Sequence, residues 1–251
     1  MARFITIASA KGGVGKTTFV SNLATALAQQ GKRVIAIDSN LTTSNLGLHL
    51  GIPLYPHTLQ DVLKGRISPG KALYTHSAGF RVLPADISMR QIMVPRASRL
   101  LNVLSRLDQA DFVLIDAAAG LGREALAAVE AGDELITVTT PELPALTDAL
   151  KVIKFADRFS TINLGVVINR VAKERHEYSQ EEVEEFLGVP VISSIPEDPA
   201  VRRAIANKTP VVLYHPHAKA SRRYHHIATQ LTGVPATLPS GFSRLVSWLR
   251  Y

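Results

Sequence analysis

The sequence predicts an α/β protein with a doubly wound, mainly parallel sheet and helices on both faces. Apolar runs rich in β-branched residues alternate with helical patterns along almost the whole chain, which is typical of repeated βαβ units. The apolar runs are short and uninterrupted, as expected for strands that are covered on both faces. The chain has 251 residues, of which 46% are hydrophobic, and this is enough for one large globular domain.

The predicted elements follow one another with few gaps. The predicted strands are residues 3–9, 33–38, 80–84, 112–116, 134–140, 165–169 and 191–195. The predicted helices are residues 17–30, 59–64, 98–108, 124–131, 143–159, 179–187, 200–207 and 218–231. Pro235 and Pro239 interrupt the pattern after the last helix. We therefore expect one domain over residues 1–232, a linker over 233–239 and a short tail over 240–251.

The most informative segment lies between the first predicted strand and the first predicted helix. Strand, glycine-rich loop and helix in this order are typical of a phosphate-binding loop (P-loop). Glycines let backbone N–H groups converge on an anion without a Cβ in the way, and the helix N-terminus adds free N–H groups and its positive dipole end. Lys16 is expected to reach the β- and γ-phosphates, and the Thr17 hydroxyl to bind Mg²⁺. The segment expected to contact a nucleotide reads Lys11-Gly12-Gly13-Val14-Gly15-Lys16-Thr17-Thr18.

Two details narrow the family. The strict P-loop pattern begins with glycine where this chain has Ala10, and one added methyl is tolerable where φ is negative. Lys11 is a second lysine at the start of the loop, and here the sequence resembles the deviant Walker A family, which includes MinD, ParA and the nitrogenase iron protein. The resemblance implies that Lys11 crosses a dimer interface to the partner's nucleotide, so that the active unit is a homodimer with ATP.

Asp116 ends another predicted strand, where a carboxylate can hold a Mg²⁺-bound water. The chain then reads Ala-Ala-Ala before Gly120. This segment resembles the Asp-Ser-Pro-Ala-Gly of MinD proteins at Asp116 and Gly120, and departs from it at Ala117 and Ala118. Gly120 is expected to bring a flexible N–H near the γ-phosphate. The expected metal-binding residues are therefore Thr17 and Asp116.

Residues 37–47 resemble the first switch segment of the family, which usually carries Asp-x-Asp. Asp38 matches the first aspartate, but the second position is Asn40. In the family the second aspartate orients or activates the attacking water. An amide can hydrogen-bond to a water but cannot take its proton. We therefore expect ATP binding with slow or absent hydrolysis, and Asp38 is the nearest carboxylate able to compensate.

Two later positions are expected to meet the base. Asn169 matches a family position whose side chain contacts adenine, and Pro196 lies in a segment that resembles the loop along the base. From the residues alone, Asn169 is equally well a strand-end turn residue. A guanine-reading site would need Asn-Lys-x-Asp, and Asn207-Lys208 lacks that aspartate. The expected cofactors are therefore ATP or ADP together with Mg²⁺.

The charge of the chain is unevenly distributed. The net charge is +7, from 28 basic and 21 acidic residues. Residues 199–251 contain eight basic residues and no acidic one, which leaves 20 basic against 21 acidic residues in the rest. A neutral body with a basic C-terminal end indicates a polyanionic partner at that end.

The tail carries an apolar stripe at helical spacing, consisting of Phe242, Leu245, Val246 and Leu249, with Trp248 beside it. Apolar residues, a tryptophan and arginines are typical of an interfacial membrane helix, and MinD proteins end in such a targeting helix. The alternative is a helix packed on its own domain. A segment this short is a marginal helix in water, so one tail should bind an anionic membrane weakly. Two tails on one dimer should bind the membrane about 10²-fold more tightly through avidity.

The chain also has features of an intracellular protein. It contains no cysteine, no apolar run approaches the ~20 residues of a membrane span, and no secretory signal is visible at its start. We expect a cytoplasmic protein that associates peripherally with the inner face of the cell membrane.

Together these features predict a MinD-like, Mg²⁺-dependent ATPase that dimerises with ATP, associates with the membrane and positions division machinery or other structures. An unidentified regulatory protein is expected as a further partner. Two alternatives stay open. One is a ParA-like partition ATPase whose basic C-terminal part contacts DNA phosphates, although the apolar tail favours lipid over nucleic acid. The other is a nucleotide-binding scaffold with little hydrolysis.

The substitution Asn40→Asp tests the expected separation of binding from hydrolysis. Restoring a carboxylate should raise the rate of phosphate release, because general-base assistance contributes about 10²–10⁴ in rate. The affinity for ATP should change little. Single-turnover phosphate release from both proteins measures the effect, and a variant no faster than the wild type would contradict the expectation.

Overall fold

The computed structural model describes residues 2–52, 55–87, 96–107 and 109–234. Their strands form one sheet in the order β3-β4-β2-β5-β1-β6-β7-β8. Among the described strands, every pairing is parallel except that of β3 with β4. The predicted fold is confirmed. The strands are β1 Arg3–Ser9, β2 Val34–Asp38, β3 Tyr74–Thr75, β4 Arg81–Leu83, β5 Phe112–Ala119, β6 Glu134–Thr139, β7 Ile162–Val171 and β8 Val191–Pro196.

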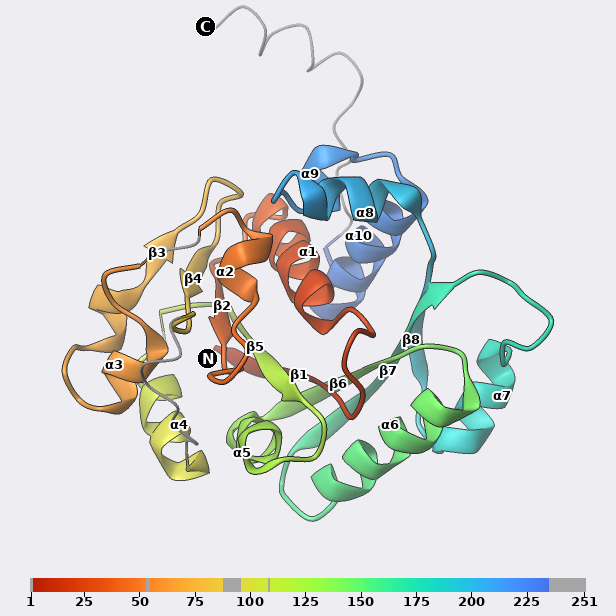
Figure 1. Ribbon diagram of the computed structural model, residues 1–251, viewed down its shortest axis with the longest axis horizontal. Helices are drawn as coiled ribbons and strands as arrows, with labels where there is room; N and C mark the ends of the chain where they lie inside the picture. Colours follow the sequence, from red (N-terminus) through yellow and green to blue (C-terminus); the bar gives the residue numbers. More distant parts are fainter. Residues whose placement is uncertain (1, 53–54, 88–95, 108, 235–251) are drawn as a thin grey trace, which may run out of the picture.

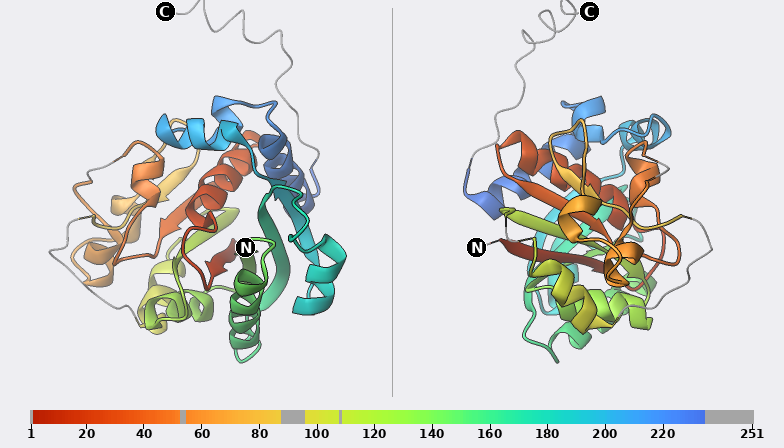
Figure 2. Two further views of the ribbon diagram at one scale, coloured as in Figure 1. Left: turned by 45° about the vertical axis from the view of Figure 1, so that its right-hand side comes forward. Right: turned by 90° about the vertical axis from the view of Figure 1, so that its left-hand side faces the viewer.

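Helices cover both faces of the sheet (Figures 1 and 2). On one face α1 and α10 pack side by side, and on the other lie α4, α5 and α6. The α-helices are α1 Lys16–Gln29, α2 Leu46–His49, α3 Leu59–Leu63, α4 Ala97–Leu104, α5 Arg123–Ala131, α6 Leu143–Ala156, α7 Gln180–Leu187, α8 Pro199–Ala206, α9 Val211–Tyr214 and α10 Lys219–Thr232, and Pro69–Ala72 forms a 3₁₀ turn.

Alternate residues of the strands feed two cores. In β2, Ala36 belongs to the cluster that includes Phe19 of α1 and Tyr224 of α10. Its neighbours Ile35 and Ile37 belong to the cluster on the other face, with side chains of α4 and α5. This alternation explains why the strands read as continuous apolar runs, since both faces are buried.

The structure corrects two predicted boundaries that bear on function. The strand expected over residues 112–116 continues to Ala119, because small residues that keep their N–H groups extend the ladder, and Ala119 pairs with Ser9. The strand expected over 165–169 is Ile162–Val171. Asp116 and Asn169 were expected at strand ends and instead lie inside β5 and β7. The elements that were not predicted (α2, α9, β3 and the 3₁₀ turn Pro69–Ala72) are too short to show a period.

The tail over residues 240–251 and residues 235–239 of the expected linker lie outside the described residues. Among the described helices, none combines the length and the apolarity needed to cross a membrane.

Candidate functional site: a phosphate-binding loop over two buried carboxylates

The glycine-rich loop connects β1 to α1 at the carboxyl ends of the central strands (Figure 1). Gly13 and Gly15 have φ angles of +79° and +97°, which L side chains rarely adopt, and a Cβ at Gly15 would lie 2.4 Å from Asn169 Nδ2. A Cβ at Gly12 would meet only Ala119 Cβ, at 3.9 Å. The loop therefore requires glycine at two of its three predicted positions.

Asn169, for which an adenine contact was predicted, lies beneath this loop. Its side chain is buried, and Nδ2 donates a hydrogen bond of 2.7 Å to the Val14 carbonyl. Asn169 and Pro196 line one cavity of about 190 Å³, together with Val201 and Tyr224. The structure thus brings the two predicted base-side residues to one cavity, while an amide N–H of Asn169 holds the loop.

Lys16 is buried within the loop, and its Nζ donates to Ser9 Oγ at 2.9 Å. Ser9 Oγ in turn donates to the Lys11 carbonyl at 2.8 Å. Burial lowers the pKa of the Lys16 ammonium, and the charge of Asp116 opposes this shift. Gly120, whose N–H was expected near the γ-phosphate, donates that N–H to the Ser9 carbonyl at 3.1 Å. Ser9, which sequence reasoning did not single out, therefore holds both Lys16 and the segment that begins at Gly120.

Asp116 lies next to Asp38 across the β5–β2 pairing, and both carboxyl groups are buried. Burial and then the charge of Asp38 raise the pKa of Asp116 to about 7, although a hydrogen bond from Thr17 and the charge of Lys16 oppose the shift. Burial raises the pKa of Asp38 to about 6. Among the described residues, Asp116 Oδ1 has no hydrogen-bond partner. A buried carboxylate oxygen without a donor, beside the Thr17 hydroxyl, fits the oxygen ligands that Mg²⁺ prefers.

Asp38 organises the segment that follows β2. Its Oδ2 accepts the Ser44 hydroxyl at 2.7 Å and the backbone N–H groups of Asn45 and Leu46 at 3.1 and 3.0 Å. Its Oδ1 accepts the backbone N–H of Asn40 at 3.1 Å. These donors occupy both oxygens, so Asp38 in this conformation folds the loop rather than facing a substrate.

Asn40 is turned into the same loop. Its Nδ2 donates to the Thr43 carbonyl at 2.8 Å, and its Oδ1 accepts the Thr43 N–H and hydroxyl at 3.1 and 3.0 Å. The amide therefore bonds to the backbone three residues further on, a local side-chain-to-backbone pattern that an asparagine favours in turns. Both hydrogen-bonding groups of the Asn40 side chain are engaged with Thr43.

Glu124 is a site residue that sequence reasoning missed. It lies in the first turn of α5, and its carboxylate accepts the N–H groups of Leu41 and Thr42 and, at 2.8 Å, the Thr42 hydroxyl. The only signal in the sequence was an acidic residue at a helix N-terminus, where the helix dipole alone would explain it. Glu124 thus ties the loop after β2 to the segment after β5.

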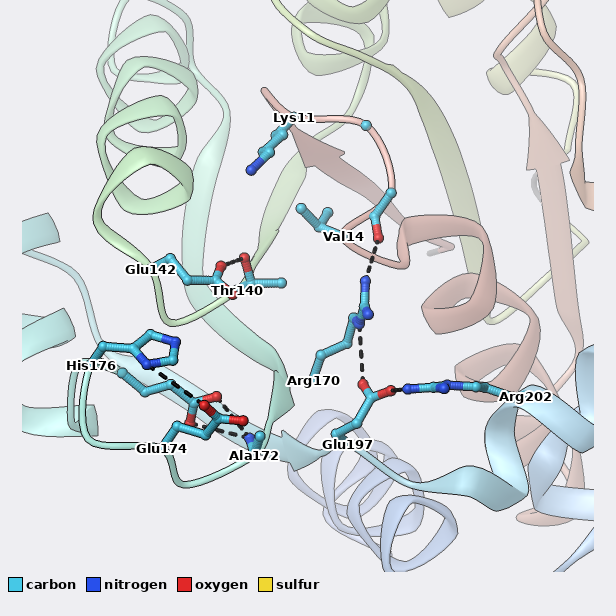
Figure 3. Close-up of a pocket in the computed structure, with 13 residues that line it drawn as sticks. Lys11, Val14, Thr140, Glu142, Arg170, Ala172, Glu174, His176, Glu197 and Arg202 are labelled. Carbon is cyan, nitrogen blue, oxygen red and sulfur yellow. Dashed lines mark hydrogen bonds and ion pairs between the residues drawn. The ribbon is translucent and has the colours of Figure 1, made fainter.

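Lys11 faces a second and larger cavity, on the side of the loop towards β6 and β7. This cavity has a volume of about 310 Å³, and Thr140 and Glu142 line it opposite the loop (Figure 3). Arg170 and Glu197 lie at its boundary with the cavity of Asn169 and Pro196. Lys11 is exposed and projects towards this open space.

The buried carboxyl pair predicts how stability depends on pH. The pKa of Asp116 is raised from 3.8 to about 7, so folding favours the protonated form, and this contribution is present at low pH and is lost as the pH rises through about 7. Asp116→Asn should therefore stabilise the nucleotide-free protein at pH 8 by about 1 kcal/mol or more, or about 2–4 °C. The stabilisation that Asp116→Asn produces should be smaller at pH 5.

Thermal unfolding of the nucleotide-free proteins at both pH values measures this effect. Asp157→Asn is a suitable control, because Asp157 is exposed and paired only loosely with Lys154, at 3.8 Å. An Asp116→Asn gain that is equal at pH 5 and pH 8 would contradict the assignment.

Comparison with known proteins identifies the family. The ParA family profile, described as NUBPL iron-transfer P-loop NTPase, matches residues 1–232. An uncharacterized ATP-binding protein of Methanocaldococcus jannaschii is 41% identical, covering 93% of this chain and 89% of that protein. The septum site-determining protein MinD of Pyrococcus horikoshii, complexed with Mg-ADP, has a TM-score of 0.88 and 35% identity, covering 92% of this chain and 96% of that one.

A chain of the MinC:MinD cell division protein complex of Aquifex aeolicus has a TM-score of 0.84 and 30% identity, covering 95% of this chain and 99% of that one. The profile match over residues 1–232 includes the phosphate-binding loop, the buried carboxyl pair and the residues that line the cavity containing Asn169. The predicted family is confirmed: the chain belongs to the MinD/ParA family of P-loop ATPases.

Proposed function

We propose that this protein is a MinD-like switch in which ATP and Mg²⁺ drive formation of a homodimer. The observation that carries the proposal is the position of Lys11, which is exposed at the mouth of the phosphate-binding loop and projects into an open cavity of about 310 Å³. A lysine there is free to reach across an interface, whereas Lys16 is buried within its own loop. The family relationship supports the same reading.

Each part of the nucleotide has residues that suit it. Lys16 leaves Ser9 for the β- and γ-phosphates, while the loop N–H groups and Thr18 hold the phosphate chain. Thr17 and Asp116 hold Mg²⁺, which supplies positive charge where the phosphates carry negative charge. Asn169 and Pro196 line the base cavity. The relative from Pyrococcus horikoshii is complexed with Mg-ADP, which supports this choice of ligand.

Hydrolysis is proposed to be slow in the absence of an activator. Asn40 cannot take a proton, and its amide is engaged with Thr43. Asp38 does not replace it, because its oxygens accept four donors of the loop. A protein that keeps ATP for a long time is suited to act as a switch, and a regulatory protein would then set its release. The MinC:MinD complex of a relative supports such a partner.

The output of the switch is proposed to be association with an anionic membrane through Phe242, Leu245, Val246, Trp248 and Leu249. The dimer would carry two tails and would therefore stay on the membrane longer than a monomer, through avidity. In the cell the protein would be cytoplasmic, peripherally bound to the inner face of the membrane, and would act in placing the division site or other structures. The relatives named for septum-site determination and cell division support this role.

The quaternary state with nucleotide tests the dimer. The wild type should be a dimer with ATP and Mg²⁺ and a monomer with ADP, because only the triphosphate offers its γ-phosphate to the partner's lysine. Lys11→Ala should stay monomeric while still binding ATP. Lys71→Ala, which removes another exposed lysine, should dimerise normally. Light scattering after size exclusion gives the masses, and a dimer of Lys11→Ala would refute the role of Lys11.

Membrane binding is tested with anionic liposomes. With ATP the full chain should co-sediment, and a chain ending at residue 239 should not. The ParA-like alternative draws on the exposed basic side chains Lys219, Arg222 and Arg223 of α10. Under that alternative the full chain would ignore liposomes and bind duplex DNA with a steep salt dependence.

A further inference from the structure

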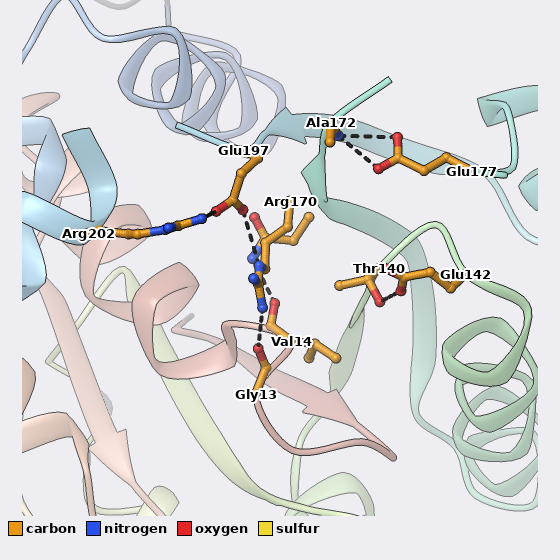
Figure 4. Close-up of polar contacts among 10 residues, drawn as sticks. Gly13, Val14, Thr140, Glu142, Arg170, Ala172, Glu177, Glu197 and Arg202 are labelled. Atoms are coloured by element: carbon orange, nitrogen blue, oxygen red, sulfur yellow. Dashed lines mark hydrogen bonds and ion pairs between the residues drawn. The ribbon is translucent and has the colours of Figure 1, made fainter. Parts of the chain in front are cut away.

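Two adjacent residues of β7, Asn169 and Arg170, hold two adjacent carbonyls of the phosphate-binding loop. Asn169 Nδ2 donates to the Val14 carbonyl at 2.7 Å. Arg170 Nη1 donates to the Gly13 carbonyl at 3.4 Å (Figure 4). The loop binds phosphate with N–H groups that point inward, which turns carbonyl groups outward. A side-chain donor fixed on such a carbonyl favours one conformation of the loop over those in which water is the donor. The dipeptide supplies such donors.

Arg170 is constrained at both ends of its side chain. Its backbone φ is +61°, in the left-handed region that arginine seldom occupies. Its Nε donates to Glu197 Oε2 at 3.1 Å, and Arg202 Nη2 donates to Glu197 Oε1 at 2.6 Å (Figures 3 and 4). Hydrogen bonds and charges from Arg202 and Arg170 hold the pKa of Glu197 below its usual range. An ionised Glu197 therefore aims the guanidinium at the loop.

Glu197 connects this contact to the base cavity. It directly follows Pro196, and Pro196, Glu197 and Arg202 all line the cavity that contains Asn169. The guanidinium bonds to Glu197 on one side and to the Gly13 carbonyl on the other, which suits the fixed fork of arginine better than the single ammonium of lysine. The carboxylate also compensates the positive charge, so the guanidinium serves the loop carbonyl rather than a phosphate.

We propose that Arg170 is a positioning residue that fixes the Gly13–Val14 part of the loop in its phosphate-binding conformation, and that Glu197 orients it. The inference rests on the proposed binding of a nucleotide, but its structural part concerns the nucleotide-free loop. Without Arg170 the Gly13 carbonyl loses its side-chain donor, and the inward N–H groups spend less time aligned. The loss of affinity should concern binding of the ligand's phosphates and leave binding of the base unchanged.

The test uses the full chain with Arg170→Ala, Arg170→Lys and Glu197→Gln. Arg170→Ala should weaken ADP binding by about 10-fold, as expected for one hydrogen bond that involves a charged group. Adenosine binding, measured by competition against a fluorescent ADP analogue, should change less than 2-fold. Arg170→Lys should bind ADP more tightly than Arg170→Ala and less tightly than the wild type. Glu197→Gln should weaken ADP binding less than Arg170→Ala does, and should add nothing in the Arg170→Ala background.

Arg203→Ala is the matched control, because Arg203 is an exposed arginine on the same helix as Arg202, and it should behave as wild type. Hydrogen exchange of a peptide covering residues 10–18, without nucleotide, should be faster in Arg170→Ala and unchanged in Arg203→Ala. This measurement stands even if the protein binds no ADP, so failure of the proposed function and failure of this inference are distinguishable. Unchanged exchange, or equal losses for ADP and adenosine, would overturn the assignment.

Discussion

The burial of two neighbouring carboxyl groups, those of Asp38 and Asp116, is the constraint on which the rest of the site depends. Like charges at low dielectric repel strongly, so each needs its own stabilising surroundings. Asp38 obtains them by folding the following loop around itself. Asp116 has Thr17 and the nearby charge of Lys16, and one of its oxygens is left without a donor. A site so organised lowers the stability of the fold when both groups are ionised, and a bound cation would offset that cost.

The fold was predictable because its signals are local and repeated. Continuous apolar strands, periodic helices and the loop from Lys11 to Thr18 follow from residue type and spacing alone. The continuation of β5 beyond Asp116 was not predictable, because three alanines favour neither a strand nor a turn. The strand reaches Ala119 because Ala119 pairs with Ser9. Glu124 and Arg170 were missed for a related reason. Their partners, Thr42 and Gly13, lie far away in the sequence, and the residues around a charged side chain in the sequence give no sign of a distant contact.

The structure also changes what Asn40 means. In the sequence, Asn40 stands where the family usually has an aspartate. In the structure, its amide forms hydrogen bonds with Thr43 that stabilise the turn. The residue therefore has a positive structural role in ordering the loop, and Asp38 is already committed to the same task. Under the proposed function, nucleotide binding and hydrolysis would be separated, because the groups that could assist a water are used to shape the loop. An incoming regulatory protein would have to rearrange that loop in order to act on the bound nucleotide.

The contact of Glu124 with Leu41 and Thr42 has a consequence for communication across the molecule. It ties the loop after β2 to the first turn of α5, and α5 packs on α4 and α6 on the far face of the sheet. Free-energy coupling is reciprocal. If a ligand of the loop shifts α5, then a protein that grips α4, α5 or α6 changes the affinity of the loop by the same factor. The face formed by α4, α5 and α6 would then be a second site, remote from the nucleotide, through which a partner could both sense and change the state of the loop.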